Sequence, residues 1–287
     1  RYQIYRRVGF YGFVPGYCET GVPGYTGYSL LAQTSSASET SFVDDGGSSG
    51  LINGLDYCYI MVTVFIDGSV SYASEEVCAS LKKDLPIITN AGNDSADLEL
   101  GYARIAWSKP TELDTLQIPG PYYYELLRAE GIGGQDFGPA GSFPGLNDTL
   151  FIDQGIDLNG AGTGYTYRVD LWSETSGFIG SSQDASTIFL EIYETDQRLE
   201  LSWAPKVPWT NEYYTIYRKS GGSTIYEAIG TAGGLSYTDT GLINGEEYCY
   251  YVESHGSYGT TGLVDPIVNY SQLNCGIPVD NVPPCPP

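Results

Sequence analysis

The sequence lacks basic charge, long apolar runs and nearly all histidine and methionine. Across 287 residues, 13 Lys and Arg oppose 35 Asp and Glu, which gives a formal net charge of −22 at pH 7. Such a chain repels nucleic acid phosphates and anionic lipid headgroups, so polyanion binding is excluded as its main activity. No run approaches the ~20 apolar residues of a membrane-spanning helix, and no basic and apolar leader opens the chain. We therefore expect a protein that does not span a membrane and binds no nucleic acid.

What is abundant favours strands and turns. The chain has 37 Gly, 16 Pro and 26 Tyr, a mixture poor in helix formers that predicts an all-β protein. Its length suits two or three domains of ~100 residues each. Six Cys at wide spacings, without close Cys or His pairs, favour disulfides in an oxidising compartment over zinc ligation. This cysteine usage predicts an extracellular location.

One motif occurs three times. Gly50–Tyr59 and Gly241–Tyr250 are nearly identical, and Gly162–Val169 keeps both tyrosines but has Thr166 in place of the cysteine. Each copy follows a strand-like run that ends on arginine and a triplet that ends on Asp. The runs are Tyr2–Arg6, Tyr124–Arg128 and Tyr214–Arg218, and the triplets are Phe42–Asp44, Phe151–Asp153 and Tyr237–Asp239.

The second and third repeats also begin with an alternating strand that ends on tryptophan. In Ala103–Trp107 and Leu199–Trp203 every second side chain is Ala, Ile, Leu or Trp, so one face of each strand is expected to be core. The first repeat has no counterpart, because the chain opens directly on Tyr2–Arg6. We therefore expect the first module to lack its N-terminal strands.

These markers resemble the fibronectin type III sandwich, which has Trp in its second strand, Tyr in its third and a Tyr-x-Tyr pattern in its sixth. The resemblance covers nearly the whole chain and implies tandem β-sandwich modules arranged end to end. It implies a module over residues 1–83 without its first strands, a disulfide-free module over 84–186 and a third over 187–279. Residues 280–287 then form a linker or the start of a further module.

A narrower resemblance concerns the C-terminal residues. Asn269–Gln272, Cys275-Gly276 and Val282–Pro287 are similar to tandem modules of gliding-motility-associated surface proteins from Bacteroidetes. The resemblance implies a fragment of a bacterial cell-surface protein that is exported by type IX secretion. Its implied partners are other modules of the same protein, outer-membrane or secretion components, and surface glycans.

Turn positions predict two disulfides. Cys58 and Cys78 flank the turn Asp67–Ser69, and Cys249 and Cys275 flank a Gly-rich connection around Gly262, so each pair is expected to face across a hairpin. Each bridge is expected to stabilise its module by ~3 kcal/mol.

Two cysteines are left over. Cys285 is expected to pair within a following module. For Cys18 we expect a bond to the missing start of the first module, with a free thiol as the alternative.

Groups for catalysis are sparse, so we expect no enzyme. A nucleophilic site would have to be built around the single histidine, His255, which is more simply a solvated turn residue after the strand Tyr248–Glu253. No phosphate-binding loop opens a helix. The acidic pairs Asp44-Asp45, Glu75-Glu76 and Glu246-Glu247 are interpreted as solvated surface.

Calcium is a better-motivated cofactor question. Asp153, Asp157 and Asn159 offer three oxygen ligands within one loop. The loop lacks a distant bidentate Glu, so turn capping by Asp and Asn is the alternative interpretation.

Five aromatic residues stand outside the repeat pattern and are candidate ligand contacts. Exposed Tyr and Trp side chains stack on sugar rings, whereas buried ones fill sandwiches. A contact within the rim or between modules is the alternative. The candidates are Trp172, Trp209, Tyr122, Tyr123 and Tyr213.

Three residues are candidate glycosylation sites. Ser95, Thr115 and Thr149 each follow Asp and precede an apolar residue, a pattern that resembles the O-glycosylation acceptor of Bacteroidetes.

These observations favour a non-catalytic piece of a large extracellular surface protein that serves as an adhesive stalk or spacer. Two alternatives remain open. The modules are accessory carbohydrate-binding modules of a secreted polysaccharide-degrading enzyme, or the open first module is completed by strand donation in an extracellular fibre.

Overall fold

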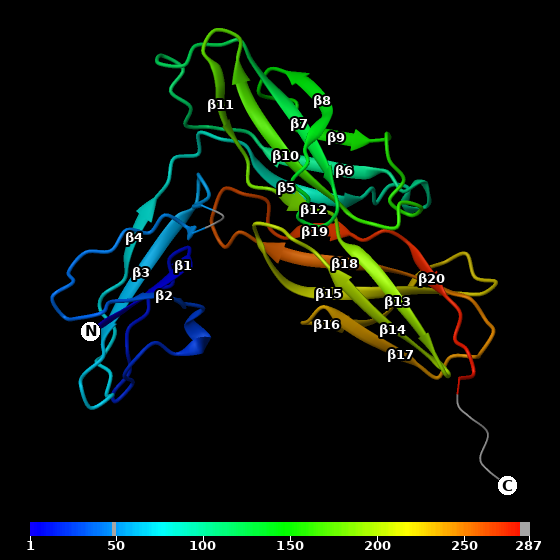
Figure 1. Cartoon of the computed structure of the whole chain (residues 1–287), viewed down its shortest axis with the longest axis horizontal. Coiled ribbons are helices and arrows are strands. Elements are labelled where there is room, and N and C mark those ends of the chain that lie inside the picture. Colours follow the sequence, from blue (N-terminus) through cyan, green and yellow to red (C-terminus); the bar gives the residue numbers. More distant parts are fainter. Residues whose placement is uncertain (48–49, 282–287) are drawn as a thin grey trace. The chain divides into compact units, whose positions relative to one another are not determined.

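The computed structural model describes residues 1–47 and 50–281 and divides them into two compact units. Unit 1 comprises Arg1–Asp84 and Tyr258–Gly262, and unit 2 comprises Leu85–Ser257 and the residues from Leu263 onward. Both units are built from antiparallel strands, as the composition predicts (Figure 1). The helical pieces are short, such as the 3-10 turns η1 (Gly24–Thr26) and η3 (Leu98–Leu100). Within the described ranges, no helix is long and apolar enough to cross a membrane.

Unit 1 contains one four-stranded sheet. Its strand order is β2 (Ser29–Gln33), β1 (Tyr2–Val8), β3 (Asp56–Thr63) and β4 (Val77–Ser80). The repeat motif Gly50–Tyr59 supplies the turn into β3, and β1 is the run that ends on arginine. The sheet therefore places two of the three repeat markers on neighbouring strands.

The segment between β1 and β2 covers one face of this sheet. Phe13 and Tyr28 from that segment form a buried cluster with Cys58 and Ile60 of β3. Val62, two residues further along β3, is also buried, at 1% exposure. Alternation places Cys58, Ile60 and Val62 on one face of the strand, and the tyrosines of the repeat motif on the other.

Unit 2 holds two β-sandwiches, and each pairs a three-stranded with a larger sheet. The middle sandwich consists of the sheets β5-β6-β9 and β11-β10-β7-β8, and the C-terminal sandwich consists of β13-β14-β17 and β16-β15-β18-β19. The short strands β12 and β20 add to β10 and β18. The bounds are β5 Ile87–Asn93, β6 Ala103–Ser108, β7 Tyr122–Glu130, β8 Gly138–Pro144, β9 Leu150–Asp153, β10 Tyr165–Ser173, β11 Gly177–Ser181, β12 Ala185–Ser186, β13 Phe189–Thr195, β14 Arg198–Ala204, β15 Thr210–Ser220, β16 Glu227–Ala232, β17 Ser236–Thr240, β18 Tyr248–Ser257, β19 Ile267–Tyr270 and β20 Asn274–Gly276.

In both sandwiches the first, second and fifth strands form one sheet and the remaining strands form the other. This is the strand arrangement of the fibronectin type III sandwich, and the fold class predicted from the repeats is confirmed. The tryptophan strands β6 and β14 are the central strands of the three-stranded sheets, as their alternation predicts. Their side chains on the core face are Ala103, Ile105, Trp107, Leu199, Leu201 and Trp203, each at most 3% exposed.

Each tryptophan packs against the tyrosine that begins the arginine-ending run of the repeat, on a central strand of the opposite sheet. Trp107 meets Tyr124 with ring centroids 5.4 Å apart, and Trp203 meets Tyr214 at 5.2 Å. These contacts join the two sheets across each core. The cross-sheet aromatic pair is thus a repeated feature of unit 2.

Candidate functional site

The arginine, aspartate and tyrosine markers of the repeats meet in space as three Arg–Asp–Tyr triads. In unit 1, Arg6 Nη1 donates to both carboxylate oxygens of Asp44 at 2.9 Å, and Tyr59 Oη donates to the same carboxylate at 2.8 Å. The equivalent triads in unit 2 are Arg128–Asp153–Tyr167 and Arg218–Asp239–Tyr250. A second tyrosine stacks on each arginine, with its ring centroid 5.4 to 5.7 Å from the guanidinium.

The triads are structural ion pairs. Burial acts to raise the pKa of Asp44, but hydrogen bonds from Gly46, Tyr59 and Arg6 outweigh it and lower the pKa below its ordinary value. Burial and the adjacent Asp44 carboxylate raise the pKa of Tyr59 to about 12. The carboxylate therefore stays charged and committed to its two partners. The interpretation of Asp44 as a solvated surface acid was wrong, because the triad buries it.

Glu76 is a second acid for which the interpretation as solvated surface was wrong. Its carboxylate accepts the backbone N–H groups of Tyr11, Gly12 and Phe13 at 2.9, 2.6 and 3.2 Å. Burial acts to raise the pKa of Glu76, but these backbone hydrogen bonds outweigh it and lower the pKa below its ordinary value. Glu76 thus anchors the segment that covers the sheet of unit 1.

The structure joins Cys58 to Cys78 and Cys249 to Cys275, residues that face each other directly on paired strands. Glu76 lies close to the first bridge and Glu247 to the second. Sulfurs in a disulfide have no thiolate to offer a metal ion, so neither cluster is a metal centre while the bridges are intact.

In the middle sandwich, Thr166 stands where the other repeats have the first cysteine. Its side chain is fully buried, donates to Gly131 O at 2.7 Å and accepts from Gly133 N at 2.8 Å. Two hydrogen bonds to a loop therefore replace the covalent bridge.

Cys18 is an exposed free thiol in unit 1. It lies in a left-handed backbone conformation, with φ 63°, and its N–H donates to Tyr72 Oη. Cys285 and its expected partner lie outside the described residues.

The three calcium candidates form hydrogen bonds with different groups of the protein. Asp153 belongs to a triad, where a guanidinium takes the place of a cation. Asp157 Oδ1 accepts the N–H of Asn159 at 2.9 Å, which is the turn-capping alternative. Asn159 Oδ1 accepts the N–H of Leu273, so each of the three side chains is engaged by groups of the protein.

His255 lies inside β18, not in a turn after it, so the expected solvated turn position was wrong. Its ring stacks on Tyr213 of β15 at 4.4 Å, and Nε2 lies 2.6 Å from Glu253 Oε1. The strand runs four residues beyond the predicted end because β15 and β19 both continue alongside it.

Two of the five aromatic candidates, both half-buried, form a cluster with an exposed phenylalanine, which we call the aromatic strip. Trp172 of β10 stacks on Tyr123 of β7 at 6.2 Å and meets Phe178 of β11 at 5.1 Å. All three lie on the face of the sheet opposite the core, and Phe178 is 53% exposed. Phe178 was not among the candidates predicted from the sequence, although the sequence places it in a strand that follows a turn.

The other three candidates lie elsewhere. Trp209 is buried at 5% exposure and donates from Nε1 to Asn211 Oδ1. Tyr122 points to the other side of β7 and donates to Ile118 O. Tyr213 is 42% exposed and belongs to the C-terminal sandwich. The five residues are therefore not a single patch.

Tyr213 extends a second aromatic group on the outer face of β15 and β18, which the repeat analysis missed. Tyr251 stacks on Tyr217 at 4.6 Å and also meets Tyr226 and Tyr270. Tyr251 directly follows the Tyr-x-Tyr pattern, so strand alternation alone places it opposite the core. At 9% exposure it is packed among its neighbours rather than presented to a ligand.

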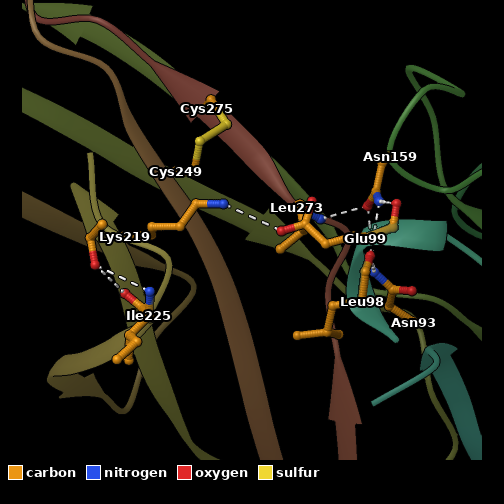
Figure 2. A network of polar contacts seen from close by, with 10 residues as sticks. Asn93, Leu98, Glu99, Asn159, Lys219, Ile225, Cys249, Leu273 and Cys275 are labelled. Carbon is orange, nitrogen blue, oxygen red and sulfur yellow. Dashed lines mark hydrogen bonds and ion pairs between the residues drawn. A yellow bond between two sulfur atoms is a disulfide. The ribbon is translucent and has the colours of Figure 1, made fainter. Parts of the chain in front are cut away.

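A polar network connects the two sandwiches of unit 2, and Figure 2 shows part of it. Asn159 Oδ1 accepts the N–H of Leu273 at 2.9 Å, and its Nδ2 donates to the carbonyls of Leu98 and Glu99. Lys219 of β15 forms an ion pair with Glu99 at 3.3 Å. Residues of the middle sandwich therefore bind both the last connection and a central strand of the C-terminal one.

The same interface continues between β5 and β19. Asn269 is 1% exposed and accepts the N–H of Ala91 at 2.7 Å, while Asn90 donates to Val268 O at 2.7 Å. A Cβ on Gly92 would lie 2.8 Å from Tyr270 O, so only glycine permits this approach. The interface is close-packed and hydrogen-bonded.

The candidate glycosylation residues lie in connections of the middle sandwich. Ser95 and Thr115 are exposed and Thr149 is half-buried. Asp94 and Asp114 each accept the N–H two residues ahead, which shapes the turns that present Ser95 and Thr115.

The chain has little sequence similarity to known proteins. No protein family model and no curated protein matches the sequence. Among solved structures, the FN1–FN3 domains of chicken CNTN1 share 12% identity, with 98% of this chain and 90% of that chain covered and a TM-score of 0.28. The chicken interferon gamma receptor alpha chain shares 12% identity, with 63% and 94% covered and a TM-score of 0.25.

Proposed function

We propose that this chain is a non-catalytic part of a large extracellular surface protein and acts as an adhesive stalk or spacer. The observation that carries the proposal is the interface within unit 2. There Asn269 and Asn159 accept hydrogen bonds from backbone N–H groups of the other sandwich, and Asn90 donates one to a backbone carbonyl of the other sandwich. A spacer must transmit direction from one module to the next, which a buried interface does and a flexible linker does not.

Nuclear magnetic resonance relaxation of the full chain tests this coupling. We expect both sandwiches of unit 2 to tumble with one rotational correlation time. Gly92→Val, which forces a Cβ against Tyr270, is expected to give the two sandwiches separate correlation times. Gly138→Val is the matched control, because open space surrounds that strand glycine. Independent tumbling of the sandwiches in the unaltered chain would refute the spacer.

We further propose a bacterial cell-surface location, with export by type IX secretion and a role associated with gliding. The support is the resemblance of Asn269–Gln272, Cys275-Gly276 and Val282–Pro287 to such surface modules, together with two disulfides that suit an oxidising compartment. Antibody labelling of intact cells that persists after type IX secretion is disabled would contradict this part of the proposal.

Carbohydrate binding is a second candidate function, favoured by the aromatic strip. Tyr123, Trp172 and Phe178 place three adjacent rings, two half-buried and one exposed, on the sheet face opposite the core, a surface suited to stacking on sugar rings. On a glycan array we expect specific binding that Trp172→Ala reduces by ~10-fold or more. Phe10→Ala, which removes a 73% exposed ring in unit 1, is the matched control and should leave binding unchanged. If the chain binds no glycan on the array, carbohydrate binding is refuted as a function.

A further inference from the structure

The aromatic strip is part of a row of side chains that crosses β8, β7, β10 and β11 of the middle sandwich (Figure 1). Trp172 of β10 lies directly opposite Tyr123 of β7 and Phe178 of β11, and Tyr123 lies opposite Pro144 of β8. Residues that face each other on paired antiparallel strands point to the same side of the sheet. The exposed Pro144 therefore continues the aromatic strip by one strand. Because neighbouring strands lie ~4.8 Å apart, the whole row is about 14 Å long.

A second row of side chains lies beside the first on the same face. It is two residues away on β8, β7 and β10, and strand alternation returns side chains to the same face at that spacing. Glu125 of β7 lies opposite Asp170 of β10, and the two outer strands add a serine at each end. We call Ser142, Glu125, Asp170 and Ser181 the polar row. Rings and oxygen-bearing side chains therefore run in parallel across the sheet.

The two carboxylates of the polar row retain capacity to accept hydrogen bonds. Ser181 Oγ donates to Asp170 Oδ1 at 2.6 Å, and Arg168 Nε lies 3.4 Å from the same oxygen. Glu125 is half-buried and forms no hydrogen bond or ion pair with any residue of the ranges 1–47 and 50–281. Like charges directly opposite each other destabilise a sheet, so the position of Glu125 beside Asp170 does not stabilise the fold. Acceptor oxygens are therefore available next to the aromatic strip.

We propose that the aromatic strip and the polar row bind a glycan chain of uncharged sugars that lies across the strands, and that they reject glycans with carboxylate or sulfate groups. This inference rests on the carbohydrate-binding function proposed above and names its class of ligand. The apolar C–H face of a sugar ring stacks on Tyr123, Trp172 and Phe178. Hydroxyl groups of the sugar donate hydrogen bonds to Glu125 and Asp170, which as carboxylates only accept.

Charge excludes acidic sugars from this position. A uronate or sulfated sugar on the aromatic strip would place its negative charge next to Glu125 and Asp170, and like charges in contact repel each other. An apolar occupant fits no better, because a lipid or an apolar protein surface would cover Glu125 without offering it a hydrogen bond. A neutral sugar satisfies both rows, since it is apolar on its faces and carries hydroxyl donors around its edge.

Calorimetry on the full chain with matched pairs of oligosaccharides tests the charge preference. The first pair is cellohexaose and the hexamer of β-linked glucuronate, and the second is β-linked mannohexaose and the hexamer of mannuronate. The members of a pair share a backbone and differ in the carboxylate. We expect the neutral member of at least one pair to bind ~10-fold or more tightly than its acidic counterpart. The neutral disaccharide of that pair should bind more weakly than the hexamer, because it reaches fewer positions of the row.

Two glutamate variants separate the effect of the site from that of the overall charge of −22. Glu125→Gln keeps the shape of the side chain but removes its charge, so the preference for the neutral member should fall by ~3-fold or more. Glu130→Gln removes the same charge from an exposed position at the other end of β7, where alternation places it on the opposite side of the sheet. This control should leave the preference unchanged. Phe178→Ala, which removes an exposed ring, should weaken binding of the neutral hexamer by ~5-fold or more.

Several outcomes would overturn the inference while carbohydrate binding itself stands. They are equal affinity within both pairs, tighter binding of the acidic members, and a preference that Glu125→Gln leaves unchanged. If neither pair binds, the glycan array decides, because binding only to neutral glycans supports the inference and binding to acidic glycans overturns it. An array without any binding refutes carbohydrate binding together with this inference. So would a dimer, seen in sedimentation velocity, that Phe178→Ala dissociates, because this face would then bind a second copy of the chain.

Discussion

At the scale of single residues, the strongest repeated device is the Arg–Asp–Tyr triad. In unit 2 each aspartate lies on the fifth strand of its sandwich and binds an arginine and a tyrosine of the opposite sheet, so one carboxylate ties the two layers together. In unit 1, Asp44 ties the segment Phe42–Asp44 to β1 and β3 in the same way. The aspartates are largely buried, at 4 to 9% side-chain exposure, while the arginines stay 28 to 30% exposed. Loss of the carboxylate would leave an arginine without its partner in a half-buried position.

We predict that Asp239→Asn lowers the free energy of unfolding of the C-terminal sandwich by ~2 to 3 kcal/mol. This cost is smaller than that of breaking a fully buried ion pair, because Arg218 keeps part of its hydration. Tyr250→Phe, which removes one hydrogen bond from the same triad, should cost ~1 kcal/mol. Urea unfolding followed by tryptophan fluorescence measures both, since Trp203 lies in this core. Glu191→Gln, at an exposed position of β13, is the control. If Asp239→Asn lowered the free energy of unfolding by less than Tyr250→Phe does, the ion pair would not have this structural role.

At the scale of strands and sheets, periodicity and repetition predict much of the fold. The alternation in Leu199–Trp203 predicts a core-facing strand, and the turn at Asp67–Ser69 predicts which cysteines face each other. Contacts between sandwiches are not visible in this way, because Asn90 and Asn269 resemble ordinary surface amides until another module covers them. The end of β18 was also missed, since its last residues owe their strand conformation to two partner strands rather than to their own pattern.

At the scale of the whole molecule, acid should affect the two units differently. Hydrogen bonds from neighbouring groups lower the pKa of five carboxyl groups, and all five lie in unit 1. They are Glu19, Glu39, Asp44, Asp67 and Glu76. Burial opposes the shift at each of them and is the largest single influence at Asp44 and Glu76, where the hydrogen bonds together outweigh it. A group whose pKa is lower in the folded state stabilises the fold above its ordinary pKa of about 4, and this contribution is lost as the pH falls through the lower folded value.

In unit 2 the pKa of one carboxyl group is shifted in the opposite direction. Burial raises the pKa of Asp184, so unit 2 gains stability from that group as the pH falls through the raised value toward the ordinary one. All four tryptophans, at positions 107, 172, 203 and 209, also lie in unit 2. Tryptophan fluorescence therefore reports the unfolding of unit 2 alone, whereas hydrogen exchange of peptides from residues 1–84 reports unit 1.

We predict that on acidification below pH 4 the amides of unit 1 lose protection before the tryptophan fluorescence changes. Glu76→Gln should weaken the pH dependence of unit 1, because that carboxyl no longer titrates, and should lower its stability at neutral pH by loosening the segment from Tyr11 to Phe13. Glu75→Gln, an exposed neighbour, should change neither. If the fluorescence transition came at the same pH as the loss of protection, or at a higher one, the hydrogen-bonded carboxylates would not set the acid stability of unit 1.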